Sequence, residues 1–194
     1  GSIFVRDDST RIIDAEFAAH GPAGFDVGMF LANVVFAWAS TQATVEDRAA
    51  RARLSSYLET LLAETLAGFV RKWRALWADQ VREPAARTAG FAEWYLDGVL
   101  RDAAGAGGVE LCRRTVGFAK VADLASIGDA GRRAAAERLC IALGKRLILE
   151  RTVVRSARDW LDRLHQAAAA HLPRAPGPRE RRAVAPGAPA EEAS

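Results

Sequence analysis

Residues 12–28, IIDAEFAAHGPAGFDVG, separate a strand-like pattern from a helical one. At their N-terminal side, β-branched and aromatic residues lie on both sides of the polar cluster Asp7-Asp8-Ser9-Thr10. This pattern predicts a β-hairpin over residues 2–17. After the corner HGPAG, residues 28–40 carry apolar groups on every side, which is typical of a helix buried all round. An isolated hairpin is marginally stable in water, so this one is expected to pack on another part of the protein.

A long helix is predicted next. Apolar residues recur at spacings of three and four over residues 54–77, and Pro84 stops the pattern. This length exceeds that of an ordinary globular helix, so a bend or break is expected near Ser55-Ser56 or at Gly68.

Further helices and their starts can be read from local signals. Thr44 with Asp47 resembles a capping box, Asp129 is a candidate N-cap, and Ser156 with Asp159 forms a second box. The segments GAGG, IGD and RTVV are expected to separate helices, which are predicted over residues 88–104, 109–125, 129–150 and 156–171.

These elements predict a mainly α fold with a short N-terminal β-hairpin. A chain of 194 residues is long enough for one well-packed domain, which we place at residues 1–172. Residues 173–194 are rich in Pro, Ala and Arg and contain almost nothing to bury, so this tail is expected to be disordered.

Composition argues against several classes of protein. The net charge is only +3 and no basic face is visible, so charged residues are interpreted as solvated helix surfaces and nucleic-acid binding is not expected. The longest apolar run, residues 27–38, is too short to span a bilayer, and the N-terminus lacks the pattern of a signal peptide.

Cys112 and Cys140 belong to no metal-binding motif and are expected to be buried, reduced thiols. A cytoplasmic protein without a membrane partner is predicted.

Two acids, Asp14 and Glu16, end the second strand-like run. In an extended segment, side chains two residues apart point the same way, so the carboxylates are expected to converge. Mg²⁺ commonly takes one or two carboxylates together with phosphate oxygens, so the pair suits a magnesium site. The alternative is that both acids are merely solvated where a strand ends.

Several stretches together resemble the methylthioribose kinase family, within the aminoglycoside-phosphotransferase-like branch of the protein-kinase fold. They are GSIFV, the hairpin turn, RIIDAEFAAHGPAGFDVGMFLAN and, downstream, CRRTVGFAKVADLASI, and the resemblance covers residues 1 to about 155. In that family a catalytic loop, His-Gly-Asp-Leu-His-Thr, runs into Gly-Ser-Ile, a hairpin and then Asp-x-Glu. The resemblance implies the C-terminal lobe of a kinase-like fold and phosphorylation of S-methyl-5-thioribose by ATP at the anomeric hydroxyl, in methionine salvage.

The resemblance also implies roles for five residues. Asp14 and Glu16 match the pair that holds Mg²⁺ against the ATP phosphates, and Asp26 matches a structural aspartate that supports the catalytic loop; an ordinary helix N-cap is the alternative for Asp26. Arg113 and Arg114 match twin arginines at the sugar site, a task that guanidinium groups suit. Without the family they would be interpreted as helix-surface charges.

The chain departs from the family pattern in places. Ala15, His20 and Lys120 stand where the family usually has other residues, and Lys120 would add a positive charge near the twin arginines. The resemblance places the catalytic aspartate upstream of Gly1 and leaves no residue here for the roles of the small N-terminal lobe. This C-terminal lobe is therefore expected to be inactive alone and to expose apolar surface on the side of the hairpin.

Two other functions stay open from the sequence. One is a related small-molecule kinase that acts on another sugar, an aminoglycoside or choline, which Lys120 keeps in consideration. The other is a non-catalytic helical interaction module in which the acids and arginines are surface residues. Trp73 and Trp77 on the long helix suggest either core packing or the face of a homodimer of the full-length protein.

Overall fold

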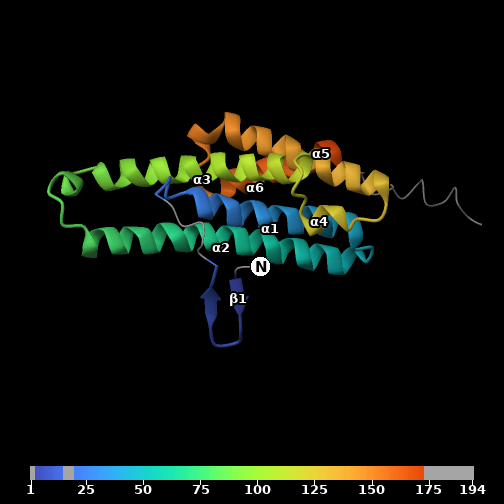
Figure 1. Cartoon of the computed structure of the whole chain (residues 1–194), viewed down its shortest axis with the longest axis horizontal. Coiled ribbons are helices and arrows are strands. Elements are labelled where there is room, and N and C mark those ends of the chain that lie inside the picture. Colours follow the sequence, from blue (N-terminus) through green and yellow to red (C-terminus); the bar gives the residue numbers. More distant parts are fainter. Residues whose placement is uncertain (1–2, 15–19, 173–194) are drawn as a thin grey trace, which may run out of the picture.

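The computed structural model describes residues 3–14 and 20–172. It consists of a small β-hairpin and a body of packed helices (Figure 1). The mainly α fold with an N-terminal hairpin, predicted from the sequence, is confirmed. The tail over residues 173–194 lies outside the described residues, so its predicted disorder stays a prediction.

The hairpin pairs β1 (Ile3–Val5) with β2 (Thr10–Ile12) in antiparallel fashion, and Ile3 lies opposite Ile12. Its turn is closed by backbone hydrogen bonds between Arg6 and Ser9. The hairpin projects away from the helices in Figure 1, and every one of its described residues is exposed. The expectation that it packs on another element is therefore wrong within the described residues, whereas the predicted exposed apolar surface is present: Ile3, Phe4, Val5, Ile12 and Ile13.

Helix α1 (Phe25–Thr44) is the central element, because α2, α3, α4 and α5 all pack against it. Nine of its residues are buried, as the continuous apolar pattern predicts: Gly28, Leu31, Ala32, Val34, Val35, Phe36, Trp38, Ala39 and Ala43. Burial on several sides stabilises this helix mainly by removing apolar surface from water.

Helix α2 (Arg48–Gln80) is unbroken over 33 residues, so the predicted break is wrong, whereas the alternative of a bend stays a prediction. The Ser55 hydroxyl donates to the Arg51 carbonyl and accepts from the Gln42 amide of α1, so its polar group is satisfied without leaving the helix. At Gly68 a Cβ atom would meet only a distant arginine side chain, which indicates no close packing constraint there. Helix propagation is favourable once a helix has started, and neither position opposes it strongly enough.

The start of α2 also differs from the prediction. Asp47 alone is the N-cap, and its side chain accepts from the Ala50 backbone N–H at 2.6 Å. Thr44 instead ends α1, where its hydroxyl donates to the Ser40 carbonyl at 2.8 Å. The capping box that begins at Thr44 is therefore wrong, because Thr44 belongs to α1 and the cap of α2 is the side chain of Asp47.

Helix α3 (Phe91–Val116) runs straight through the GAGG segment, which was expected to separate two helices. The reason is close helix packing. A Cβ atom at Gly107 would lie 2.5 Å from the Trp160 ring and 2.9 Å from the Gly28 carbonyl oxygen, and one at Gly108 would lie 2.6 Å from the Gly144 carbonyl oxygen. These glycines allow the backbones of α1 and α5 to approach α3, and that tertiary gain outweighs their poor helix propensity.

The remaining helices follow the local signals more closely. Asp129 caps α5 (Ala130–Leu149) by accepting from the Arg132 N–H at 2.7 Å. Ser156 and Asp159 form the predicted capping box of α6 (Ala157–His171). The predicted helix over residues 109–125 is wrong, because its first half completes α3 and only the short α4 follows. The short elements are η1 (Ala85–Arg87), α4 (Ala122–Ala125) and η2 (Arg151–Val153).

The two tryptophans of α2 pack within the body. The rings of Trp73 and Trp77 stack at 4.6 Å between centroids, and both contact Tyr95 of α3, at 6.1 and 5.4 Å. Both are half-buried, so the core-packing interpretation fits them in part. The homodimer stays a prediction.

Both cysteines are free thiols on separate helices, as predicted. Their predicted burial is confirmed for Cys140 on α5 and is wrong for Cys112 on α3, which is only half-buried. Across the described residues, no helix has both the length and the apolar character that crossing a membrane requires.

Candidate functional site

Asp14 follows the hairpin in an unusual backbone conformation. The second strand ends at Ile12, and Asp14 has a φ of +66°, the left-handed region. Among the described non-glycine residues it alone has a positive φ, and such residues cluster at functional sites. The extended backbone assumed for Asp14 therefore ends before this residue. Glu16 lies outside the described residues, so convergence of the two carboxylates stays a prediction.

The exposed Asp14 carboxylate offers the hard oxygen donor that magnesium prefers, so this residue fits the implied ion chemically. Within residues 3–14 and 20–172 there is no cluster of three or more His, Cys, Asp or Glu side chains that could hold a metal. A magnesium ion at Asp14 would therefore need oxygens from Glu16, water or a bound phosphate.

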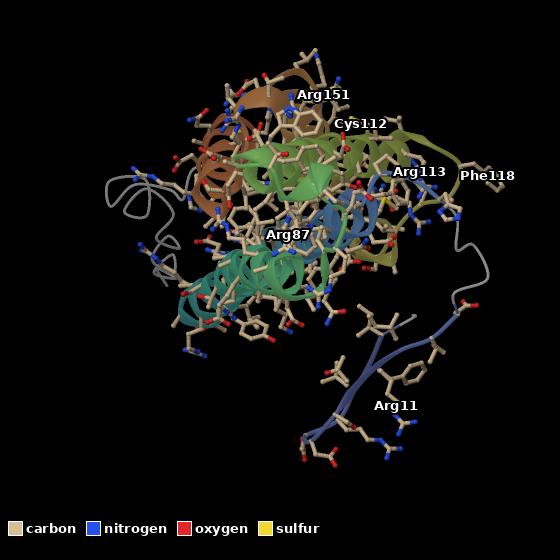
Figure 2. The ribbon with its side chains drawn as sticks, turned by 90° about the vertical axis from the view of Figure 1, so that its left-hand side faces the viewer. Arg11, Arg87, Cys112, Arg113, Phe118 and Arg151 are labelled. Carbon is tan, nitrogen blue, oxygen red and sulfur yellow. The ribbon has the colours of Figure 1, made fainter. Side chains whose placement is uncertain are left out.

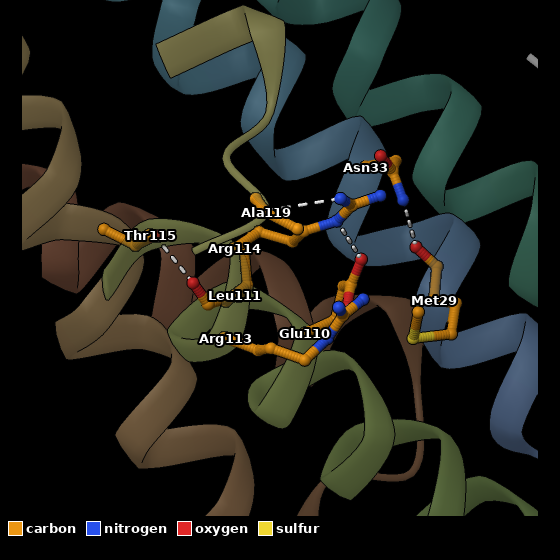
Figure 3. Close-up of polar contacts among 8 residues, drawn as sticks. All are labelled: Met29, Asn33, Glu110, Leu111, Arg113, Arg114, Thr115 and Ala119. Carbon is orange, nitrogen blue, oxygen red and sulfur yellow. Dashed lines mark hydrogen bonds and ion pairs between the residues drawn. The ribbon is translucent and has the colours of Figure 1, made fainter. Parts of the chain in front are cut away.

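Arg113 and Arg114 lie in the last turn of α3, and both bind the same carboxylate (Figure 3). Nε and Nη2 of Arg113 donate to Oε2 of Glu110 at 3.0 and 2.6 Å. Nε of Arg114 donates to Oε1 of Glu110 at 3.0 Å. The Glu110 side chain is only 1% exposed, whereas those of Arg113 and Arg114 are 50% and 33% exposed. The carboxylate is therefore covered, while part of each guanidinium group still faces solvent.

Glu110 was not identified from the sequence. A buried carboxylate is costly unless it is paired and hydrogen-bonded, and here two guanidinium groups supply both charge and donors. The signal in the sequence is the spacing of Glu110 from the arginines, three and four residues, which places all three on neighbouring positions of one helix. What the spacing does not give is the burial of Glu110, which depends on the packing of α3.

Hydrogen bonds connect the segment after α3 to the two arginines. Arg114 Nη1 donates to the Ala119 carbonyl at 3.3 Å (Figure 3). Gly117 ends the helix, and its N–H donates to the Arg113 carbonyl at 2.8 Å; a Cβ atom there would lie 2.2 Å from that oxygen. Phe118 is fully exposed and projects outward beyond Arg113 in Figure 2.

Lys120 has a local partner. Its ammonium group donates to the Thr115 carbonyl near the C-terminus of α3, where the helix dipole favours a positive charge. Lys120 also lines a groove of about 680 Å³ between the end of α3 and α5, with Lys145 and Arg138. The lysine that departs from the family pattern therefore helps to end the helix that carries the twin arginines.

Asp26 lies exposed in the first turn of α1. The N-cap of this helix is Gly24, without a side-chain hydrogen bond, so the interpretation of Asp26 as an N-cap is wrong. A carboxylate in the first turn is still favourable beside the helix dipole. Asn33, two turns later on the same face, is also exposed, and its Nδ2 donates to the Met29 carbonyl at 2.8 Å.

Comparison with known proteins gives closely agreeing relatives. Methylthioribose kinases of Yersinia enterocolitica, Pectobacterium carotovorum and Geobacillus thermodenitrificans are 39%, 38% and 38% identical to this chain, over 86%, 87% and 82% of its length. Over most of its own length, the chain is similar to methylthioribose kinases. The matched part makes up 41%, 42% and 38% of those kinases, so the chain spans about two fifths of their length. No protein-family model matches the chain.

This similarity confirms the resemblance to the methylthioribose kinase family seen in the sequence, because the relatives carry the name that the motifs indicated. The roles of individual residues stay predictions. Among the described members of the predicted site, the structure brings Arg113 and Arg114 together through Glu110.

Proposed function

We propose that this chain is the helical, sugar-binding part of an ATP-dependent kinase that phosphorylates S-methyl-5-thioribose at its anomeric hydroxyl. The product would be S-methyl-5-thioribose 1-phosphate, an intermediate of methionine salvage. Identity of 38–40% to methylthioribose kinases over most of the chain supports the substrate. The observation that carries the proposal is the pair of half-exposed guanidinium groups at the end of α3.

The proposed chemistry suits these groups. The anomeric oxygen would attack the γ-phosphorus of ATP, form the new P–O bond and release ADP. Arg113 and Arg114 would donate hydrogen bonds to sugar hydroxyls and stabilise the negative charge of the phosphoryl group in transfer. The departing hydroxyl proton needs a base, and none of the residues that the family resemblance assigns in this chain has that role.

A magnesium ion would be held by Asp14 and Glu16, and when bound it neutralises charge on the nucleotide phosphates. Asp26 would support the loop that brings the base to the hydroxyl. Because phosphoryl transfer depends on all these parts together, we propose that residues 1–194 alone do not turn over substrate.

The test is a substrate panel on the full-length gene product. ADP release would be measured with S-methyl-5-thioribose, other pentoses, an aminoglycoside and choline. We expect turnover with methylthioribose, and Arg113→Ala and Arg114→Ala should each raise KM for the sugar by about tenfold or more. Arg71→Ala, at an exposed position on α2, is the matched control and should leave KM unchanged. Turnover with another member of the panel but not with methylthioribose would reject the substrate, and no turnover with any member would support the non-catalytic module.

A further inference from the structure

The strongest unexplained feature near the proposed sugar site is Glu110. Its side chain is 1% exposed, yet it is an acid in a site proposed to bind a phosphoryl group. Both of its oxygens are used, Oε2 by two nitrogens of Arg113 and Oε1 by Nε of Arg114. An acid that served only to solubilise the surface would not be buried with two arginines bound to it.

Building on the proposed function, we propose that Glu110 is a positioning residue that fixes both guanidinium groups and also sets the charge of the sugar site. Arginine side chains have many rotamers, and holding them by charge-assisted hydrogen bonds before substrate binds reduces the cost of ordering them. The two bonds from Arg113 to a single oxygen fix the plane of its guanidinium group. Arg114 is fixed at two points, since it also binds the Ala119 carbonyl.

Glu110 also changes the net charge of the sugar site. Two arginines and one glutamate carry a net charge of +1, whereas the arginines alone would carry +2. A neutral sugar gains little from the extra charge, but a phosphorylated product or free phosphate gains from it directly. Glu110 therefore lets the site hold a neutral sugar in a defined orientation while it limits the affinity for the anionic product.

These two tasks separate experimentally. Glu110→Gln keeps the size of the side chain but removes its charge, so the arginines lose their fixed partner and the site gains one positive charge. In the full-length gene product we expect KM for methylthioribose to rise about tenfold. We expect the inhibition constant of the 1-phosphate product to rise less than KM does, by a factor of at least about three at low salt, because one unit charge roughly 6 Å away in water favours the anion by that amount.

Two further variants isolate the causes. Glu110→Asp keeps the charge but shortens the side chain by one methylene, so it cannot span both guanidinium groups. It should raise KM for the sugar and the product inhibition constant by the same factor, and it serves as the geometric test if Glu110→Gln does not fold. Glu64→Gln makes the same charge change at an exposed position of α2 and should alter neither constant.

A double-mutant cycle decides whether Glu110 acts through the arginines. In an Arg113→Ala, Arg114→Ala background, Glu110→Gln should change KM for the sugar by less than about twofold, since nothing is left to position. Additive effects in this cycle, or equal weakening of sugar and product binding in Glu110→Gln, would overturn the proposal, because general structural damage predicts both.

Binding of inorganic phosphate separates this proposal from the proposed function. Titration calorimetry of the full-length gene product with phosphate requires no turnover. If methylthioribose is not a substrate but Glu110→Gln still strengthens phosphate binding at least about threefold, the kinase assignment fails and the charge-setting role of Glu110 stands. If methylthioribose is a substrate and phosphate binding is unchanged in Glu110→Gln, the charge-setting role fails alone.

Discussion

Gly28 of α1 and Ala103 of α3 lie in direct backbone contact, since a Cβ atom at Gly28 would lie 2.2 Å from the Ala103 carbonyl oxygen. The same atom would lie 2.8 Å from the backbone nitrogen of Gly107. Backbone cannot move aside as a flexible side chain can, so the contact requires glycine on α1. This relationship holds the central helix against the helix that carries Glu110 and the twin arginines.

We therefore expect Gly28→Ala to destabilise the chain. The methyl group would push α1 away from α3, and overpacking of this kind lowers the free energy of unfolding by about 1 to 3 kcal/mol. Gly68→Ala on α2 is the matched control. A Cβ atom there meets only an arginine side chain at 3.8 Å, so the better helix propensity of alanine should stabilise by about 0.5 to 1 kcal/mol. Urea unfolding followed by circular dichroism measures both, and equal effects of the two substitutions would contradict the packing argument.

The glycines of α3 explain why the helix break predicted at GAGG was wrong. GAGG reads locally as a helix break, because glycine has the poorest helix propensity after proline. Only the three-dimensional arrangement shows that Gly107 and Gly108 sit where other backbones and a tryptophan ring approach α3. The break expected in α2 failed for a related reason: no local signal there was strong enough to interrupt a helix supported by periodic packing.

Predictions from short sequence patterns were correct where the stabilising interaction joins residues that are close in the sequence. Asp129 and the Ser156–Asp159 box were predicted because a side chain that satisfies nearby backbone donors needs no tertiary partner. At the candidate site, the two arginines were predicted from the family motif. Glu110 was not predicted, because its burial depends on how α3 packs. The left-handed backbone of Asp14 was not predicted either, because an apolar run that ends in an acid carries no signal for a positive φ.

The capping box of α6 predicts a pH dependence of stability. Burial raises the pKa of Asp159, but hydrogen bonds from the Ser156 hydroxyl and from the backbone of Arg155 and Ser156 outweigh it, and the net shift is below the ordinary value of 3.8. A carboxyl whose pKa is lowered on folding stabilises the protein above its unfolded pKa and loses this contribution as pH falls through the folded value. The stability difference between the chain and Asp159→Asn should therefore be constant from pH 5 to 8 and shrink below 3.8.

Unfolding midpoints in urea, measured at several pH values, test this dependence. Asp162→Asn on the same helix is the control, because its pairing with Arg158 is an exposed contact at 3.7 Å. Exposed pairs of this spacing contribute only a few tenths of a kcal/mol. A stability difference for Asp159→Asn that stays constant down to pH 2 would show that the box does not depend on the charge of Asp159.

The two thiols are expected to differ in reactivity. Burial raises the pKa of Cys140 to about 12, so at pH 8 only about one thiol in ten thousand is the reactive thiolate. Burial also raises the pKa of Cys112, but this side chain is half-buried and Lys145 counteracts the shift. An aromatic disulfide reagent at pH 8 should therefore label one equivalent quickly and the second only after denaturation. Cys112→Ser should abolish the fast phase; its persistence in that variant would contradict the assignment.

The left-handed backbone of Asp14 shapes the test of the proposed magnesium site. Asparagine tolerates this conformation as aspartate does, so Asp14→Asn removes the charge without imposing backbone strain. In the full-length gene product we expect Asp14→Asn and Glu16→Gln each to raise the dissociation constant of magnesium ADP by about tenfold or more, because each removes an anionic ligand. Asp7→Asn, in the exposed turn of the same hairpin, should leave nucleotide affinity unchanged. Chelation of magnesium should weaken ADP binding in the unaltered protein and have little further effect in the two site variants. Two outcomes would place the metal elsewhere: nucleotide affinity that is unchanged in both variants, or an equal response to chelation in all of the proteins. Asp14 would then be an acid whose backbone conformation serves only the turn out of the hairpin.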